Sequence, residues 1–139
     1  MAAHENASRR QIVPAAMQSF YDDYHFSPAT QVGDTIWVSG QVGVDAEMRP
    51  GVGMEAQARL VFEALKMILA EAGADLADVV ELTTFHTDLR GQMAEFRAVK
   101  DQYLPDRYPA WTAVGVTQLA HPDFLVEVRA VAVVGSGRS

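Results

Sequence analysis

A segment near the C-terminus, residues 125–134 (LVEVRAVAVV), constrains the fold more than any other part of the sequence. Its composition is typical of a β-strand, in which residues two apart point to the same side of a sheet. One side of this strand is wholly apolar and consists of Val126, Val128, Ala130, Ala132 and Val134. The other side carries Glu127 and Arg129 among apolar residues and is too apolar to be left in water. We therefore expect helices against the first side and another copy of the chain against the second.

Two helices have the pattern needed to cover the apolar side. From Met54 to Ala72, apolar residues recur at helical spacing, and charged residues occupy the opposite face. Gly73 follows this helix at the position where a glycine commonly ends one. The spacing of apolar residues predicts a second helix over about residues 92–104, and Pro105 stops it.

Three further strands are expected before the last one. The first covers residues 35–40 (TIWVSG) after a turn at Gly33-Asp34, and the second covers residues 79–88. In the second strand, strict alternation would place Val80 on the same side as His86. The third strand covers residues 108–116. Elements in this order predict an α+β fold, in which a mixed sheet carries two helices on one face.

The length and composition suit a single domain. The chain has 139 residues, of which 49% are hydrophobic, and we expect one domain over residues 19–134. Residues 1–18 and 135–139 show no sustained periodicity, so both ends are expected to be flexible tails.

Charge and residue types exclude several classes of function. The net charge of -7 would repel phosphates, which makes nucleic acid an unlikely partner. The chain has no cysteine, which excludes disulfides and cysteine-bound metals, and no pair of histidines or acids has metal-ligand spacing on a helix. We expect no metal and no cofactor. Because no segment approaches the eighteen or so apolar residues of a membrane span, and the first residues resemble no signal peptide, we expect a cytoplasmic protein without membrane contact.

Short motifs occur along most of the chain in a characteristic order. They are Ser39-Gly40-Gln41 after a strand, Gln57 early in the first helix, Ala72-Gly73 at its end, residues 80–89 (VELTTFHTDL), Phe96, Tyr103 and Pro109-Ala110. Together they resemble the RidA/YjgF/UK114 family, from about residue 24 to residue 134. The resemblance implies a chorismate-mutase-like fold and a homotrimer with a ligand cleft between adjacent subunits. It also implies hydrolysis of a reactive enamine or imine to a carbonyl compound and ammonia, without metal or cofactor.

The resemblance also indicates site residues. Glu127 matches the glutamate that is expected to position the attacking water, and Gly40 matches the glycine whose backbone lines the cleft. Trp111 stands where the family has an arginine that binds the substrate carboxylate, and Lys100 replaces an asparagine of the second helix. The usual aromatic residue of the cleft is also missing, although Phe26 lies nearby in the sequence. The chain therefore resembles a divergent branch, with a substrate more apolar or neutral than an imine held by its carboxylate.

Several of these residues have two interpretations. Glu127 is either a general acid/base at a subunit boundary or the partner of Arg129 in an ordinary ion pair. Trp111 is either a plate on which a ligand stacks or simple interface packing. Arg129 lies on the right strand to replace the missing arginine, and the hydroxyl of Thr112 is placed to bind a ligand. His86 is either a proton shuttle or a hydrogen-bonded core residue.

Three functions are compatible with these features. The first is a cofactor-free hydrolase, a deaminase acting on an enamine, an imine or a related activated carbonyl metabolite in an intersubunit cleft. The second is a non-catalytic module that binds or senses a small molecule, because loss of the arginine removes the substrate clamp. The third is an endoribonuclease, a label often attached to this family, which the acidic charge argues against.

Overall fold

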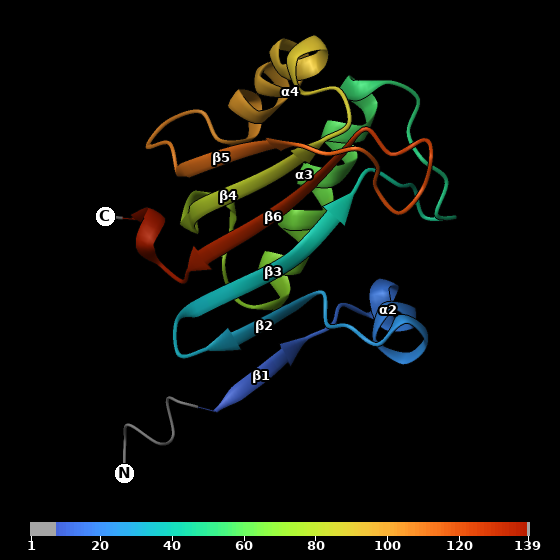
Figure 1. Cartoon of the computed structure of the whole chain (residues 1–139). Helices are drawn as coiled ribbons and strands as arrows, with labels where there is room; N and C mark the ends of the chain where they lie inside the picture. Colours follow the sequence, from blue (N-terminus) through green and yellow to red (C-terminus); the bar gives the residue numbers. More distant parts are fainter. Residues whose placement is uncertain (1–7, 139) are drawn as a thin grey trace.

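The computed structural model describes residues 8–138, which form a six-stranded sheet with helices packed against it (Figure 1). The strands are β1 (Arg9–Ile12), β2 (Ala29–Val32), β3 (Thr35–Val42), β4 (Val79–His86), β5 (Ala110–Gly115) and β6 (Val126–Val133). The α-helices are α2 (Gln18–Tyr24), α3 (Met54–Glu71) and α4 (Leu89–Tyr103). Three short 3-10 helices are η1 (Ala15–Met17), η2 (Leu76–Asp78) and η3 (Ser136–Arg138).

The sheet is mixed. Its strand order is β1-β2-β3-β6-β4-β5. β4 and β5 are parallel and are connected through α4, whereas the other neighbouring strands are antiparallel. The predicted α+β fold with a mixed sheet is confirmed. The parallel pair needs a crossover connection, and α4 supplies it.

The core lies between the sheet and the two long helices. α3 and α4 cover the same face of the sheet, as Figure 1 shows. α3 ends where predicted, since Gly73 takes a φ of 79° that continues no right-handed helix. The β6 residues predicted to face the helices are buried, and they are Val126, Val128, Ala130 and Ala132. They pack against buried side chains of both helices, including Phe62 and Phe96.

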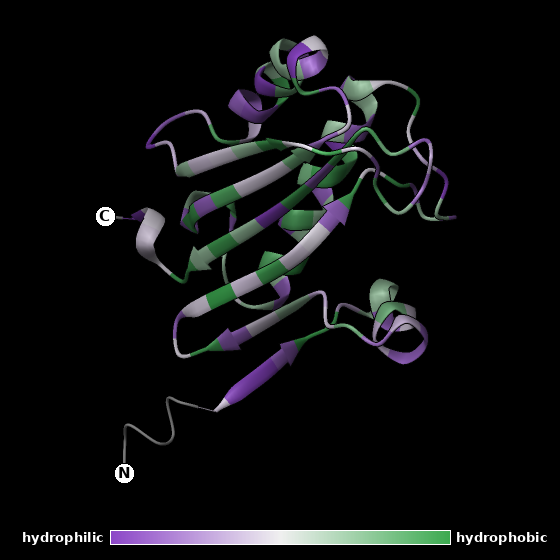
Figure 2. Cartoon of the chain, viewed as in Figure 1, coloured by the Kyte–Doolittle hydropathy of each residue, from purple (hydrophilic) through white to green (hydrophobic). Residues whose placement is uncertain are grey.

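α3 and α4 leave the other face of the sheet uncovered, and this face contains large apolar side chains. Trp37 on β3 lies opposite Val131 on β6 and is 40% exposed. Figure 2 shows hydrophobic residues recurring along β3 and β6, whereas β1 is largely hydrophilic. We call the face of the sheet that α3 and α4 leave uncovered the open face. Glu127 and Arg129 lie on it, because their neighbours Val126 and Val128 point into the core.

The two ends of the domain differ from the prediction. Residues 9–18 were expected in a tail, but β1 pairs with β2, and Ile12 is buried in the core. At the other end, residues 136–138 form η3, and the backbone N–H of Gly137 donates to Asp78 Oδ1 at 2.8 Å. One buried residue in a four-residue strand gives no sequence periodicity, and neither does a hydrogen-bonded turn. The expected tail residues 1–7 and 139 lie outside the described residues.

The side assignment of β4 was wrong at its first residues. The pairing of β4 with β6 shifts register between Val79 and Glu81, so Val79 is buried and Val80 is 40% exposed. From Leu82 onward the predicted alternation holds, and Leu82, Thr84 and His86 are buried. A β-bulge of this kind reverses the side on which residues lie, and strict alternation does not anticipate it.

None of the helices within residues 8–138 combines the length and apolar character that crossing a bilayer requires.

Candidate functional site

A bulge in β3 brings Gly40 under the side chain of Glu127. Val38 pairs with Ala130 and Gln41 with Val128, so Ser39 and Gly40 together oppose the single residue between these partners. A Cβ atom on Gly40 would lie 2.3 Å from Glu127 Oε2 and 2.7 Å from its Cδ. The carboxylate therefore lies directly over the Gly40 backbone, a position that a side chain at residue 40 would obstruct. The two residues that the resemblance indicates as the catalytic acid and the cleft backbone are in contact.

The surroundings of Glu127 favour its protonated form. Burial raises the pKa of this carboxyl above its ordinary value of 4.5. Among residues 8–138, no cation lies within ion-pair distance of it. The alternative of an ordinary ion pair with Arg129 is wrong, because the Arg129 guanidinium lies 4.0 Å from Glu81 instead. A partly buried carboxyl without a cation has the raised proton affinity that general acid/base catalysis uses.

Trp111 lies on the other side of the sheet from Glu127. It is in register with the buried Leu82, and its ring packs 6.0 Å from that of Phe96 under α4. Its Nε1–H donates to Thr84 Oγ1 at 3.0 Å, which uses the one donor that the indole has. Trp111 and Glu127 of the same chain therefore cannot line one cleft. A cleft that contains both requires a second copy of the chain.

Lys100 contacts Trp111 directly. Its Nζ lies 4.9 Å from the centre of the Trp111 ring and 5.4 Å from that of Tyr108. The side chain is only 6% exposed, and Nζ donates to Asp101 Oδ1 at 3.0 Å. The charge of Lys100 is thus satisfied within the chain by two aromatic faces and a carboxylate.

His86 belongs to the core. Its Nε2 lies 2.7 Å from Thr84 Oγ1, and Thr84 already accepts a hydrogen bond from Trp111. The Thr84 hydroxyl is then placed to donate to Nε2, which assigns the ring proton to Nδ1. Burial lowers the pKa of His86, and its Nδ1 contacts no polar partner among the described residues. Because His86 lies on the side opposite Glu127, the structure favours the core interpretation over the proton shuttle.

Arg129 and Thr112 both lie on the open face, and the Arg129 guanidinium is directed toward Glu81 on β4. Thr112 is on the edge strand β5 and is in register with Thr83, which pairs in turn with Arg129. Thr112 is exposed, so its hydroxyl is accessible on the open face. Of the predicted set, Gly40 contacts Glu127 within one chain.

A cavity of about 480 Å³ opens beside Ser39, the neighbour of Gly40. Its lining includes Arg9, Gln11, Tyr21, His25, Phe26 and Ser39. Phe26 was predicted as a ligand contact, whereas the residues from β1 and α2 were missed. A signal was present in the sequence, since four aromatic residues fall within residues 20–26 of a segment that begins in the presumed tail.

Gln57 fixes the backbone that precedes Glu127. Its Nε2 donates to the carbonyl oxygens of Gly51 at 2.9 Å and Asp123 at 2.7 Å, and its Oε1 accepts from the N–H of Leu125 at 2.8 Å. Gln57 is 1% exposed, so all three hydrogen bonds are protected from water. The buried amide thus ties the start of β6 to the loop before α3.

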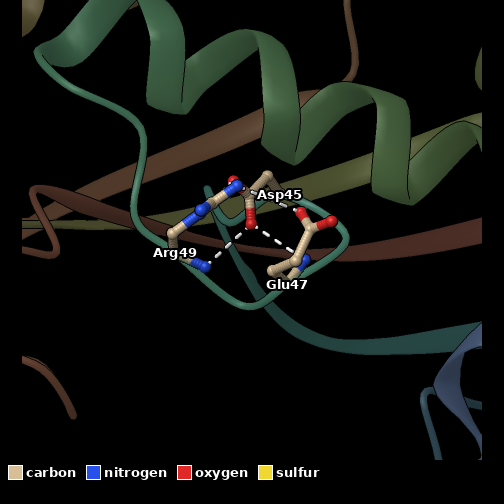
Figure 3. Close-up of polar contacts among 3 residues, drawn as sticks. All are labelled: Asp45, Glu47 and Arg49. Atoms are coloured by element: carbon tan, nitrogen blue, oxygen red, sulfur yellow. Dashed lines mark hydrogen bonds and ion pairs between the residues drawn. The ribbon is translucent and has the colours of Figure 1, made fainter.

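The loop before α3 has its own polar support, shown in Figure 3. Asp45 Oδ1 accepts the backbone N–H groups of Glu47 and Arg49, both at 2.9 Å, and Asp45 Oδ2 lies 3.0 Å from Arg49 Nε. Hydrogen bonding from the Arg49 backbone is the main cause that lowers the pKa of Asp45. These contacts are exposed and order the turn. Within residues 8–138, no group of three or more acids and histidines is arranged to hold a metal ion.

The sequence is similar to a known protein family and to several of its members. Residues 17–134 match the family model described as "Endoribonuclease L-PSP". The RutC family protein YjgH of Escherichia coli is 40% identical over 121 residues, covering 86% of this chain and 92% of the relative. The 2-iminobutanoate/2-iminopropanoate deaminase of Dermatophagoides farinae is 30% identical over 115 residues, covering 78% of this chain and 85% of the relative.

Solved structures agree with the sequence matches. The structure of protein YJGH superposes with a TM-score of 0.82 at 38% identity, covering 91% of this chain and 96% of the other. RidA from the Antarctic bacterium Psychrobacter sp. gives a TM-score of 0.81 at 35% identity, covering 90% of this chain and all (100%) of the other. Because the family model spans most of the chain and both sequence and fold agree, this chain belongs to the RidA/YjgF/UK114 family.

Proposed function

We propose that this protein is a cofactor-free hydrolase that converts an imine or enamine, or a related activated carbonyl metabolite, in a cleft between subunits. The observation that carries this proposal is the position of Glu127. Its carboxyl is partly buried, has a raised pKa, lies against the Gly40 backbone and has no ion-pair partner among residues 8–138. Such a group takes up and returns a proton within one reaction.

The chemistry needs one water molecule and one proton carrier. The Glu127 carboxylate accepts a proton from water while the water oxygen bonds to the imine carbon. The carboxyl returns this proton to the imine nitrogen, which gives a neutral carbinolamine. Glu127 then moves the hydroxyl proton of the carbinolamine to the amino nitrogen while the C–N bond breaks and the C=O bond forms. One imine and one water thus give one carbonyl compound and one ammonia, and Glu127 is restored.

The relatives support this reaction type. The Dermatophagoides farinae relative carries the name 2-iminobutanoate/2-iminopropanoate deaminase, and a second similar structure is a RidA. The description of the family model names an endoribonuclease, but a net charge of -7 disfavours binding of RNA phosphates. An imine substrate therefore agrees better with the charge of this chain.

A homotrimer is the assembly that we propose for this cleft. The open face exposes Trp37 and Val114 by 40% and 38%, an area that a partner subunit would remove from water. Trp111 lies on the edge strand β5 and points to the side of the sheet opposite Glu127. An intersubunit cleft would bring the Trp111 side of one copy to the Glu127 side of the next.

Glu127→Gln is the direct test, and Glu81→Gln is its matched control. Both are acids on the open face, but Glu81 is exposed and lies beside Arg129. We expect Glu127→Gln to abolish the disappearance of an imine generated in situ, measured above the rate in buffer, and Glu81→Gln to keep the wild-type rate. Undiminished turnover in Glu127→Gln would exclude the mechanism.

A second candidate is binding without turnover, and the pairing of Lys100 favours it. The one donor of Trp111 already bonds to Thr84, and the Lys100 ammonium is buried against two aromatic rings and bonded to Asp101, so neither is presented to a substrate carboxylate. Stabilisation of the protein by a metabolite, without any conversion of imines by the wild type, would support this candidate over the hydrolase.

A further inference from the structure

The cavity beside Ser39 lies on the same face of the sheet as Glu127. Arg9 on β1 is in register with Val32, Val32 with Thr35, and Thr35 with Val133 on β6. Val133 and Glu127 are six residues apart on β6, and residues an even number apart share a side of a strand. Arg9 and Glu127 therefore both project from the open face.

The cavity also reaches the Glu127 site through continuous backbone. Ser39 lines the cavity, and the next residue, Gly40, carries the Glu127 carboxylate over its backbone. The Ser39 hydroxyl donates to the carbonyl oxygen of Ser27 at 2.7 Å, which joins β3 to the segment that follows α2. Ser39 at the cavity and Gly40 beneath Glu127 are thus neighbouring residues of one strand, β3.

The charge of the cavity is opposite to that of the chain. The chain carries a net charge of -7, yet the lining residues include Arg9 and contain no carboxylate. Arg9 forms no ion pair with any acid among residues 8–138. An arginine without a carboxylate partner, at the wall of a cavity of ligand size, is suited to hold an anionic group in bidentate geometry.

The aromatic wall of the cavity is held in place before any ligand binds. α2 ends at His25, which adopts a left-handed φ of 61° while its N–H donates to the Phe20 carbonyl. The following residue, Phe26, stacks on Phe20 with ring centres 5.4 Å apart. A residue other than glycine is held in this conformation at a cost, and such positions cluster at ligand sites.

We propose that this cavity binds the acid group of the substrate, with Arg9 as the residue that determines specificity for it. The proposal rests on the function proposed for Glu127. Three strand spacings, about 14 Å, separate β1 from β6, and Arg9 lies about 20 Å from Glu127 along the strands because it is level with Val133; the extended side chains of Arg9 and Glu127 span part of this distance. A ligand that contacts Arg9 while its reacting carbon lies at Glu127 must therefore be longer than a three-carbon imino acid. This predicts substrates that carry an acid group remote from the imine.

A series of oxo acids tests the proposal, because each carries an acid group and a carbonyl like that of the product. Binding of pyruvate, 4-oxopentanoate and 6-oxoheptanoate is measured by calorimetry, with neutral 2-heptanone as the comparison. We expect affinity to increase with chain length, and 2-heptanone to bind at least ten-fold more weakly than 6-oxoheptanoate. Equal binding of pyruvate and the longer acids would overturn the predicted length.

Arg9→Gln and Arg10→Gln separate the cavity from general charge effects. Both arginines are exposed on β1, but successive residues of a strand point to opposite sides, so Arg10 does not face the cavity. We expect 6-oxoheptanoate to bind at least ten-fold more weakly to Arg9→Gln, and as in the wild type to Arg10→Gln. Wild-type binding by Arg9→Gln would overturn the role of Arg9.

Turnover distinguishes a failure of this inference from a failure of the hydrolase proposal. If both are correct, Arg9→Gln raises KM for acid-bearing imines and leaves hydrolysis of neutral imines unchanged, while Glu127→Gln loses turnover of both. If the wild type hydrolyses no imine but binds oxo acids through Arg9, the hydrolase proposal fails and the anion site stands. If imines turn over equally in the wild type and Arg9→Gln, the anion site fails alone.

Discussion

Replacing Gly40 with alanine changes the position of the proposed catalytic carboxyl of Glu127 but leaves the carboxyl group itself in place. The added Cβ would lie 2.3 Å from Glu127 Oε2, 2.7 Å from Cδ and 3.0 Å from Cγ. Ordinary contacts between non-bonded atoms are close to 3.5 Å, so the carboxylate must move by about 1 Å. A misplacement of this size costs a catalytic group about 100-fold in rate. We therefore expect Gly40→Ala to lower kcat for imine hydrolysis by about two orders of magnitude.

The stability of Gly40→Ala should change little. The obstructing atoms belong to the end of a flexible side chain, which can rotate away without moving the backbone. Gly40 also has no positive φ, so alanine fits its backbone conformation. Gly115→Ala is the matched control, because its Cβ would meet Leu89 at an ordinary 3.5 Å. Thermal unfolding and kcat are measured for both variants and the wild type.

Three outcomes would refute this reasoning. Wild-type kcat in Gly40→Ala would mean that the position of the carboxylate over residue 40 does not matter to the reaction. A large loss of thermal stability would mean that the added methyl group displaces the backbone of β3 or β6 instead of the Glu127 side chain. A loss of kcat in Gly115→Ala as well would point to a general effect of glycine replacement.

Two further variants test the surroundings of Glu127. Gln57→Ala leaves the Gly51 and Asp123 carbonyls and the Leu125 N–H without their partner, and we expect it to lower the free energy of unfolding by about 2–4 kcal/mol in urea denaturation. Glu127→Gln removes a carboxyl whose folded-state pKa is above the unfolded value of 4.5. The protonated carboxyl therefore contributes to the stability of the folded wild type below pH 4.5. This contribution is lost as the pH rises through the folded-state pKa. Urea denaturation from pH 4 to pH 8 should show Glu127→Gln gaining stability relative to the wild type, and a constant difference would contradict the shift.

The long-range arrangement of the fold could be predicted because its signals are periodic. Residues 54–72 repeat at helical spacing and residues 125–134 alternate, and both elements lie where this pattern placed them. The alternation also identified which side of β6 faces the helices, since Val128 and Ala132 are buried. Periodicity of this length is set by burial, which acts on every second or third residue.

β1 and α2 could not be predicted in the same way. β1 has four residues and one buried side chain, and α2 has seven residues, none of them buried. Their stability comes from pairing with β2 and from aromatic contacts such as that of Phe20 with Phe26. Contacts between distant segments leave no local pattern, so the cavity that these elements line was also missed.

The two bulges illustrate a second limit. The register shift in β4 exposes Val80, and the shift in β3 places Gly40 beneath Glu127. The first was missed, because alternation assigns Val80 to the side of His86, which the structure shows to be buried. The second was accessible only through the resemblance, which paired a glycine with a glutamate that lie far apart in the sequence. Bulges occur at functional strand ends, where they direct side chains away from the regular pattern.

Lys100 and Trp111 show why the missing arginine changes more than one residue. The resemblance expects an asparagine and an arginine at these two positions, and the structure places Lys100 Nζ 4.9 Å from the Trp111 ring. An arginine at position 111 would put a second cation beside the buried Lys100 ammonium and repel it, whereas the indole face of Trp111 attracts the ammonium. The two replacements therefore form one packed unit that keeps its charge inside the chain. The acid group of a substrate must then bind to a cation at another position. Arg9 lies on the Glu127 side of the sheet and has no acid partner among residues 8–138.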